Sequence, residues 1–193
     1  FWRVARIRNS FFLCAIKPNE LSLVYFKKFI LSKDFTEFLS YFQELTLPIV
    51  FQEGSEHEYS MKNDALPDKC IDQFILPSMD FETDDMTEFV PCGFWKTTHG
   101  QIVVIIWCAR LLRYSFFAIV FDINGKAYES MEIAGFFTDG EYLIRRMVNI
   151  DLDDTFYIVE GAHLIDEKEF DISKTRKIVA EIMPDGRIAK MVS

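Results

Sequence analysis

Apolar residues near the start of the acidic part of the chain recur at helical spacing. Between residues 34 and 45, apolar side chains recur every three or four positions and share one helical face: Phe35, Phe38, Leu39, Phe42 and Leu45. Asp34 precedes this run with Glu37 three residues later, as in a capping box, and Pro48 enforces a stop. The pattern predicts an amphipathic helix of about three turns.

A shorter run predicts a second helix. Pro67 suits the first helical position, and the apolar residues between it and Pro77 share one face: Cys70, Ile71, Phe74 and Ile75. The segments 52–65 and 78–90 are polar and acidic, and we interpret them as exposed loops.

After Pro91 the pattern changes to the short apolar runs of β-strands. We expect eight strands, near residues 93–98, 101–109, 114–122, 126–134, 142–150, 155–160, 176–183 and 187–192. Asn124-Gly125 and Asp185-Gly186 are hairpin signals, because Gly supplies the positive φ that tight turns need. Strands joined in this way pair antiparallel, so residues 91–193 are predicted to form a β-meander.

Residues 100–121 are apolar at odd and even positions alike, which is typical of strands covered on both faces. The Phe-rich helix is the expected cover for one face. We therefore predict an α+β fold, with short N-terminal helices packed on a C-terminal antiparallel β-meander sheet of about eight strands. The pattern leaves open whether the strands split into a sandwich or curl toward a barrel.

The net charge of −9 is unevenly distributed. Residues 1–33 carry seven basic groups and one acidic group, whereas residues 34–90 carry fourteen acidic groups and two basic ones. We expect a basic N-terminal appendage at 1–33 and a single domain at 34–193, with helices and acidic loops up to residue 90 and the meander from 91. An acidic body repels phosphate backbones, which argues against nucleic acid and favours a basic protein partner.

The chain shows no predicted transmembrane segment, because Arg110 and Arg113 interrupt its best apolar stretch. The basic start followed by residues 11–16 has some features of a signal peptide, although Lys17-Pro18 follows at once. The cytoplasm is the expected location. The cell envelope or secretion is the alternative if the N-terminus is a degenerate or incomplete signal.

The residue types that often carry chemistry are scattered. The four Cys and three His have none of the local spacings of a zinc site or a disulfide scaffold, so we expect mostly buried thiols. The carboxylate clusters at 80–85 and 151–154 lack the spacing of a calcium loop, and no phosphate-binding Gly motif or nucleophile elbow is present. We predict no catalytic residue, no metal and no cofactor.

The order of the elements is similar to that of a group of small bacterial α+β proteins of unknown function. Four segments carry the likeness: Glu44-Leu45-Thr46-Leu47-Pro48-Ile49, Lys69-Cys70-Ile71-Asp72-Gln73-Phe74, Phe121-Asp122-Ile123-Asn124-Gly125-Lys126 and Asp185-Gly186-Arg187-Ile188. The resemblance implies a fold and supplies no activity.

These observations predict a non-enzymatic binding or protein-interaction module, for example an acidic inhibitor or immunity-type protein. Most aromatic residues of the sheet are interpreted as core. The expected interaction surface consists of turn-flanking aromatics and loop carboxylates: Trp95, Phe136, Phe137, Asp84 and Asp85.

Two alternatives remain open. One is a metal-dependent or acid/base hydrolase whose residues converge only in three dimensions, drawn from Asp84, Asp85, His99, Asp153 and His163. The other is an envelope-associated structural protein.

Overall fold

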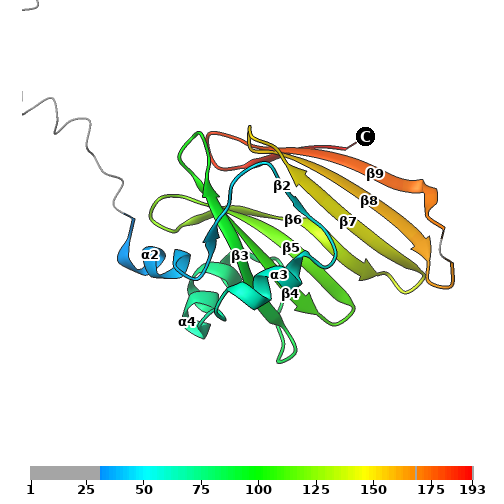
Figure 1. The fold of residues 1–193 in the computed structure, drawn as a ribbon, viewed down its shortest axis with the longest axis horizontal. Helices are drawn as coiled ribbons and strands as arrows, with labels where there is room; N and C mark the ends of the chain where they lie inside the picture. The colour runs from blue at the N-terminus through cyan, green and yellow to red at the C-terminus, as the bar shows by residue number, and fades with distance from the viewer. Residues whose placement is uncertain (1–30, 168, 193) are drawn as a thin grey trace, which may run out of the picture. The chain divides into compact units, whose positions relative to one another are not determined.

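The computed structural model of the protein describes residues 31–167 and 169–192 (Figure 1). The chain divides into two units, residues 1–30 and residues 31–193. The expected basic appendage, except for residues 31–33, therefore lies outside the described residues, as do the signal-like segment and Cys14.

The fold is α+β, as predicted, with short helices followed by a mostly antiparallel ten-stranded sheet. The helical segments are α2 (Lys33–Leu39), α3 (Ser55–Lys62) and α4 (Asp68–Cys70), the last of which continues as a π-helical turn (Ile71–Ile75) and a 3-10 turn (Leu76–Ser78). The strands are β1 (Gln43–Glu44), β2 (Ile49–Phe51), β3 (Glu88–Lys96), β4 (Ile102–Arg110), β5 (Arg113–Phe121), β6 (Ala127–Thr138), β7 (Tyr142–Ile150), β8 (Thr155–Leu164), β9 (Asp171–Ile182) and β10 (Ile188–Val192).

Strands β3 to β10 follow one another across the sheet in chain order, each antiparallel to the next, so the predicted meander is confirmed. β1 adds a short parallel strand beside β3. β6 and β7 pair only over Gly135–Thr138 and Leu143–Arg146, and β2 lies antiparallel beside the rest of β7. In the described residues the strand order runs from β1 to β10 without closing.

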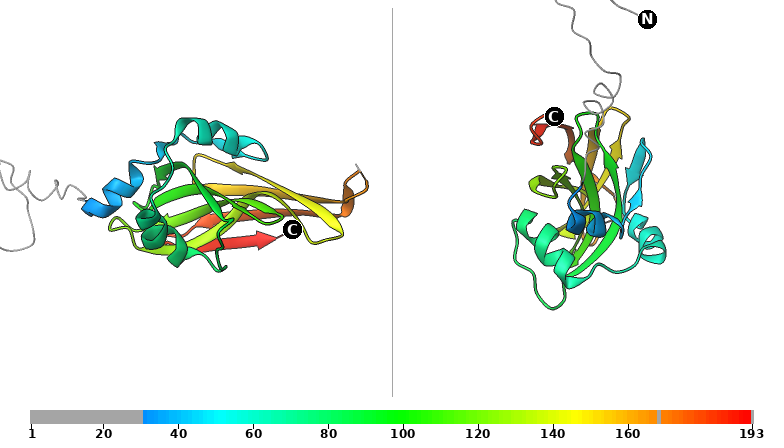
Figure 2. Two further views of the ribbon diagram at one scale, coloured as in Figure 1. Left: turned by 90° about the horizontal axis from the view of Figure 1, so that it is seen from below. Right: turned by 90° about the vertical axis from the view of Figure 1, so that its left-hand side faces the viewer.

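The central strands are covered on both faces, as their sequence predicted. Alternate residues of a strand point to opposite faces. One set, including Val104 and Ile119, packs against the helical segments through Phe38 and Phe74. The other set packs against residues of β2 and of the later strands. Figure 2 shows α3 and α4 on opposite sides of the central strands, in agreement with their places in the two clusters.

Helix α2 is shorter than predicted, and its cap differs. Ser32, rather than Asp34, is the N-cap, and its hydroxyl accepts a 3.2 Å hydrogen bond from the backbone N–H of Phe35. The helix ends at Leu39 because the chain then joins the sheet. β1 pairs with β3, and the N–H of Leu45 donates a 2.7 Å hydrogen bond to the carbonyl oxygen of Phe94.

The segment 52–65, predicted to be a loop, contains helix α3. Tyr59 is its buried residue, and the Tyr59 ring stacks on Phe51 with centroids 5.7 Å apart. A helix with one buried position has no apolar periodicity, which explains why the sequence pattern did not reveal it. The short strand β2 just before it was not predicted either.

Three cysteines are buried free thiols, as predicted: Cys70, Cys92 and Cys108. Burial raises the pKa of the Cys108 thiol to about 12 and raises the pKa of Cys92 well above its ordinary value. Among residues 31–167 and 169–192, no helix is long and apolar enough to cross a bilayer.

Candidate interaction surface

Antiparallel strands bring alternate connections to the same end of a sheet. The loop before β3 and the turns β4–β5, β6–β7 and β8–β9 lie at one end (Figure 1). We call this end the rim, and it comprises residues 82–88, 110–114, 136–142, 164–167 and 169–172. The turns β3–β4, β5–β6, β7–β8 and β9–β10 lie at the opposite end.

Large apolar side chains are exposed at the rim. Leu111 and Leu112, at the tip of the β4–β5 hairpin, are 82% and 62% exposed. Further apolar side chains are exposed along the rim: Met86, Ile165, Phe170 and Ile172. Among the described turns of the opposite end, Leu152 and Met183 are exposed. The rim therefore exposes more large apolar side chains than the described turns of the opposite end.

Leu112 also has an unusual backbone. Its φ is 59°, in the left-handed region that disfavours residues with a bulky side chain. The exposed side chain recovers none of this cost by packing in the core. A conformational cost of this kind is common at functional positions, so it adds to the case for the hairpin tip as a contact point.

The rim is acidic. Its carboxylates come from all of its segments except the β4–β5 hairpin: Glu82, Asp84, Asp85, Glu88, Asp139, Glu141, Asp166, Glu167, Glu169 and Asp171. Several of them also order the turns. The carboxylate of Asp84 accepts a 2.9 Å hydrogen bond from the Thr87 hydroxyl, and backbone N–H groups of Tyr142 and Glu141 lower the pKa of Asp139.

Three aromatic rings form a row on one face of β4, β5 and β6, and two of them belong to the rim. Tyr114 and Phe136 are opposite each other in the strand register, and their rings stack with centroids 4.8 Å apart. Trp107 stacks on the other side of Tyr114 at 6.0 Å. The row lines a hollow of about 170 Å³ together with Glu53 and Glu56. The aromatic row is thus placed beside two carboxylates from the start of the α3 region.

The charges around the hollow are partly engaged. Glu56 accepts a 2.9 Å hydrogen bond from the N–H of Gly54, and Glu53 forms a 3.4 Å ion pair with Arg145 at half-exposed positions. Aromatic ring faces carry partial negative charge and attract cations. Ring faces next to carboxylates are therefore suited to a Lys or Arg side chain of a partner.

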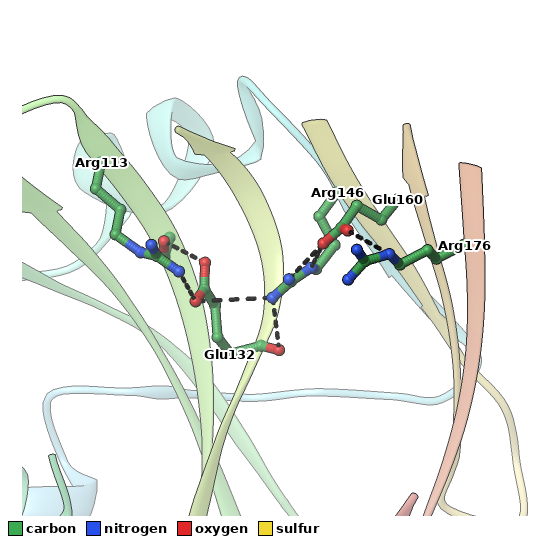
Figure 3. Close-up of polar contacts among 6 residues, drawn as sticks. Arg113, Glu132, Arg146, Glu160 and Arg176 are labelled. Atoms are coloured by element: carbon green, nitrogen blue, oxygen red, sulfur yellow. Dashed lines mark hydrogen bonds and ion pairs between the residues drawn. The ribbon is translucent and has the colours of Figure 1, made fainter. Parts of the chain in front are cut away.

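A ladder of alternating charges crosses five strands behind the rim, as Figure 3 shows. Its members are Arg113 on β5, Glu132 on β6, Arg146 on β7, Glu160 on β8 and Arg176 on β9. Arg146, Glu160 and Arg176 are direct cross-strand partners. The Nε atom of Arg146 donates a 3.0 Å hydrogen bond to Glu160, and Nη1 lies 3.7 Å from Glu132.

Most of the ladder is buried. The side chains of Glu160 and Glu132 are 10% and 14% exposed. Glu132 also accepts a 2.7 Å hydrogen bond from the Ser115 hydroxyl and pairs with Arg113. Charges held in this way are costly to desolvate but still costlier to leave unpaired. The ladder therefore fixes the mutual position of the strands whose turns make the rim.

Four of the five residues predicted for an interaction surface lie at the rim. Asp84 and Asp85 are on the loop before β3, and Phe136 belongs to the aromatic row. Phe137 points to the other face of β6, where the guanidinium carbon of Arg113 lies 4.1 Å from its ring centroid.

Trp95 is a correction to the prediction. It is 4% exposed and belongs to the core, so it is not open to a partner. Its indole N–H donates a 2.8 Å hydrogen bond to Asp154 of the β7–β8 turn. Proximity to a turn in the sequence suggested exposure, but the β7–β8 turn covers this ring.

The residues of the hydrolase alternative are not brought together. Asp84 and Asp85 lie at the rim, whereas His99 and Asp153 lie in turns of the opposite end. His163 is near the rim end of β8, which at about 3.3 Å per residue places it roughly 30 Å along the chain from Asp153. Within residues 31–167 and 169–192, no group of three or more His, Cys, Asp and Glu is arranged to hold a metal ion.

Sequence reasoning missed two parts of the site. Trp107 and Tyr114 were interpreted as core. Residues 52–65 were predicted to be an exposed loop, so nothing in the sequence suggested that Glu53 and Glu56 lie beside these rings. The charge ladder depends on strand register, which the sequence alone does not supply.

Comparisons of the chain with protein-family models, with curated proteins and with solved structures found no match. The likeness to small bacterial proteins therefore stays a prediction.

Proposed function

We propose that the protein is a non-enzymatic binding module that recognises a basic partner protein through the rim and the aromatic row. The observation that carries the proposal is the hollow in which Trp107, Tyr114 and Phe136 stack beside Glu53 and Glu56. Aromatic side chains are frequent anchors of protein interfaces, and neighbouring carboxylates select a cationic group.

The surroundings of the hollow support the same partner chemistry. The acidic rim would attract a basic surface and speed its approach, because complementary charge acts mainly on association. The exposed Leu111 and Leu112 would then supply apolar contact area. An inhibitor or immunity-type protein that covers a basic enzyme is one concrete form of such a module.

The scaffold suits this task because the rim is held by sheet hydrogen bonds and by the charge ladder. A preorganised surface loses little conformational entropy on binding. Trp107, Tyr114 and Phe136 lie on strands, and Leu111 and Leu112 form a two-residue turn, so these side chains have little freedom to be repositioned.

The experiment is an affinity capture from the native host at low salt, with each bound protein identified and its net charge noted. Wild type is compared with Glu56→Lys and Tyr114→Ala, and with Glu181→Lys as a control that makes the same charge change on β9, near the opposite end. We expect a basic protein to be retained by wild type and by Glu181→Lys, and to be lost with the two site variants. If no basic protein is retained, or if all four forms retain it equally, the proposal is wrong.

A further inference from the structure

A polar cavity of about 630 Å³ lies on the other side of the β4–β5 hairpin from the aromatic row. Arg110 and Arg113 line it, and by strand alternation they point away from the face that carries Trp107 and Tyr114. Segment 77–81, strand β6 and Lys190 of β10 complete the wall. The hairpin thus presents aromatic rings on one face and guanidinium groups on the other.

Arg110 and Arg113 are direct cross-strand partners on either side of a two-residue turn. Like charges in this arrangement destabilise a hairpin. Each guanidinium rests on an aromatic ring: the Cζ atom of Arg110 lies 3.5 Å from the centroid of Phe81, and that of Arg113 lies 4.1 Å from the centroid of Phe137. Stacking holds a guanidinium in a fixed plane while its N–H edge stays available to another partner.

The positive charge at this cavity is only partly neutralised by the residues described. Arg113 shares Glu132 with Arg146, and its Nε atom is buried without a hydrogen-bond partner in the described part of the chain. Arg110 and Lys190 form no ion pair with any residue of 31–167 or 169–192.

Two of the three carboxylates of the cavity wall have partners in the described residues. Glu132 belongs to the charge ladder and also accepts the Ser115 hydroxyl. Glu129 accepts a 2.7 Å hydrogen bond from the N–H of Ile188. Asp80 is the third carboxylate of the wall, which carries the three basic side chains Arg110, Arg113 and Lys190. Because Glu132 is paired with Arg113, Arg110 and Lys190 are the basic groups of the wall that have no ion pair among the described residues.

We propose that this cavity binds the oxyanion group of a small molecule, a carboxylate or a phosphate, between Arg110 and Arg113, with Lys190 as a further basic group of the wall. Guanidinium groups bind both oxyanions through paired N–H donors. The cavity volume lies in the range of small-molecule sites. An oxyanion would also relieve the repulsion between the paired arginines, so binding should stabilise the fold.

The test is titration calorimetry and thermal unfolding with three salts at equal ionic strength: inorganic phosphate, acetate and chloride. We expect phosphate or acetate to bind saturably and to raise the Tm above its value in chloride, and the oxyanion that does so identifies the ligand group. Loss of one charged hydrogen-bonding partner in Arg110→Gln should weaken that binding about tenfold or more.

Two further variants sharpen the comparison. Arg187→Gln removes an exposed arginine in the β9–β10 turn of the opposite end and should leave oxyanion affinity unchanged. Lys190→Gln is a second site variant at an exposed position, and it serves if Arg110→Gln fails to fold. The proposal is overturned if neither oxyanion binds better than chloride, or if the site variants bind as wild type does. Glu56→Lys should keep oxyanion binding, because Glu56 lines the hollow on the other face of the hairpin and not this cavity.

Discussion

Arg146 and Glu160 lie directly opposite each other on β7 and β8, and one carboxylate oxygen of Glu160 accepts hydrogen bonds from both Nε and Nη2 of Arg146. The other carboxylate oxygen lies 3.9 Å from Nε of Arg176. Glu160 therefore holds two arginines from neighbouring strands, and it does so at a nearly buried position.

Replacement of Glu160 should be strongly destabilising. Glu160→Gln leaves the Arg146 guanidinium buried with a weaker partner, and loss of one member of a buried pair costs about 3–5 kcal/mol. Urea denaturation would measure the change in the free energy of unfolding. The exposed pair of Glu58 and Lys62 on α3 provides the control, since Glu58→Gln should cost about 0.5 kcal/mol or less. Equal effects of the two substitutions would show that burial adds nothing to the ladder.

The phenylalanines that pack α2 against the rest of the domain should be among the most sensitive positions of the core. Phe38 is fully buried, and its ring centroid lies 4.7 Å from that of Phe74 and 4.9 Å from that of Phe42. Phe38→Ala should lower the free energy of unfolding by about 3–5 kcal/mol, because the cavity cannot be refilled by its neighbours. Phe170→Ala, at a half-exposed ring, should cost far less in the same denaturation assay. A small loss for Phe38→Ala would mean that α2 is not packed as described.

The hairpin tip should gain stability when its strained residue is replaced. Leu112 has a φ of 59°, and Asn adopts this region more readily. Leu112→Asn is expected to raise the free energy of unfolding by about 1 kcal/mol while weakening partner binding. Leu111→Asn removes a similar exposed side chain without a positive φ, and it should weaken binding without the gain in stability. A loss of stability in Leu112→Asn would contradict the strain argument.

Stability should fall at high pH. Burial raises the pKa of Cys108 to about 12 and that of Tyr59 to about 12, whereas their ordinary values are 9.0 and 10.0. The unfolded chain therefore releases these protons first. The stabilisation is complete below about pH 9 and is lost as the pH rises from there toward about 12.

The contribution of the thiol can be isolated with Cys108→Ala. The free energies of unfolding of wild type and variant can be measured by urea denaturation between about pH 8 and about pH 10.5. They should diverge by up to about 1.4 kcal/mol per pH unit, with the value for wild type falling more steeply. Parallel curves would show that Cys108 titrates normally in the native state.

The sequence predicted the sheet well because its strands are apolar runs bounded by turn residues. All eight expected strands are present, and β9 begins earlier than predicted because its first residues, 171–175, are mostly polar. β3, β6 and β8 also extend beyond their predicted bounds. The helical part was harder to predict. Helix α2 ends earlier than predicted because the chain then forms β1, and the pairing of β1 with β3 is a tertiary contact that local periodicity does not reveal.

The candidate site was predictable only where it depends on position along the chain. Asp84 and Phe136 were expected at the surface because they flank or lie in connections, and both are at the rim. Trp95 followed the same reasoning and is buried, since the residue that covers it comes from a distant turn. The association of Tyr114 with Glu56, like the charge ladder, needs strand register and the path of α3.

The short strand β2 has a consequence for how the protein is made. Ile49 pairs with Ile150, about 100 positions later, and Phe51 is buried by that pairing. During synthesis, β2 cannot pair until β7 has been made, and contacts of such long sequence separation are slow to form. The first half of the domain therefore cannot complete its native structure without β7. A chain cut before β7 would expose Phe51 and the β2 edge, and such species are prone to aggregate.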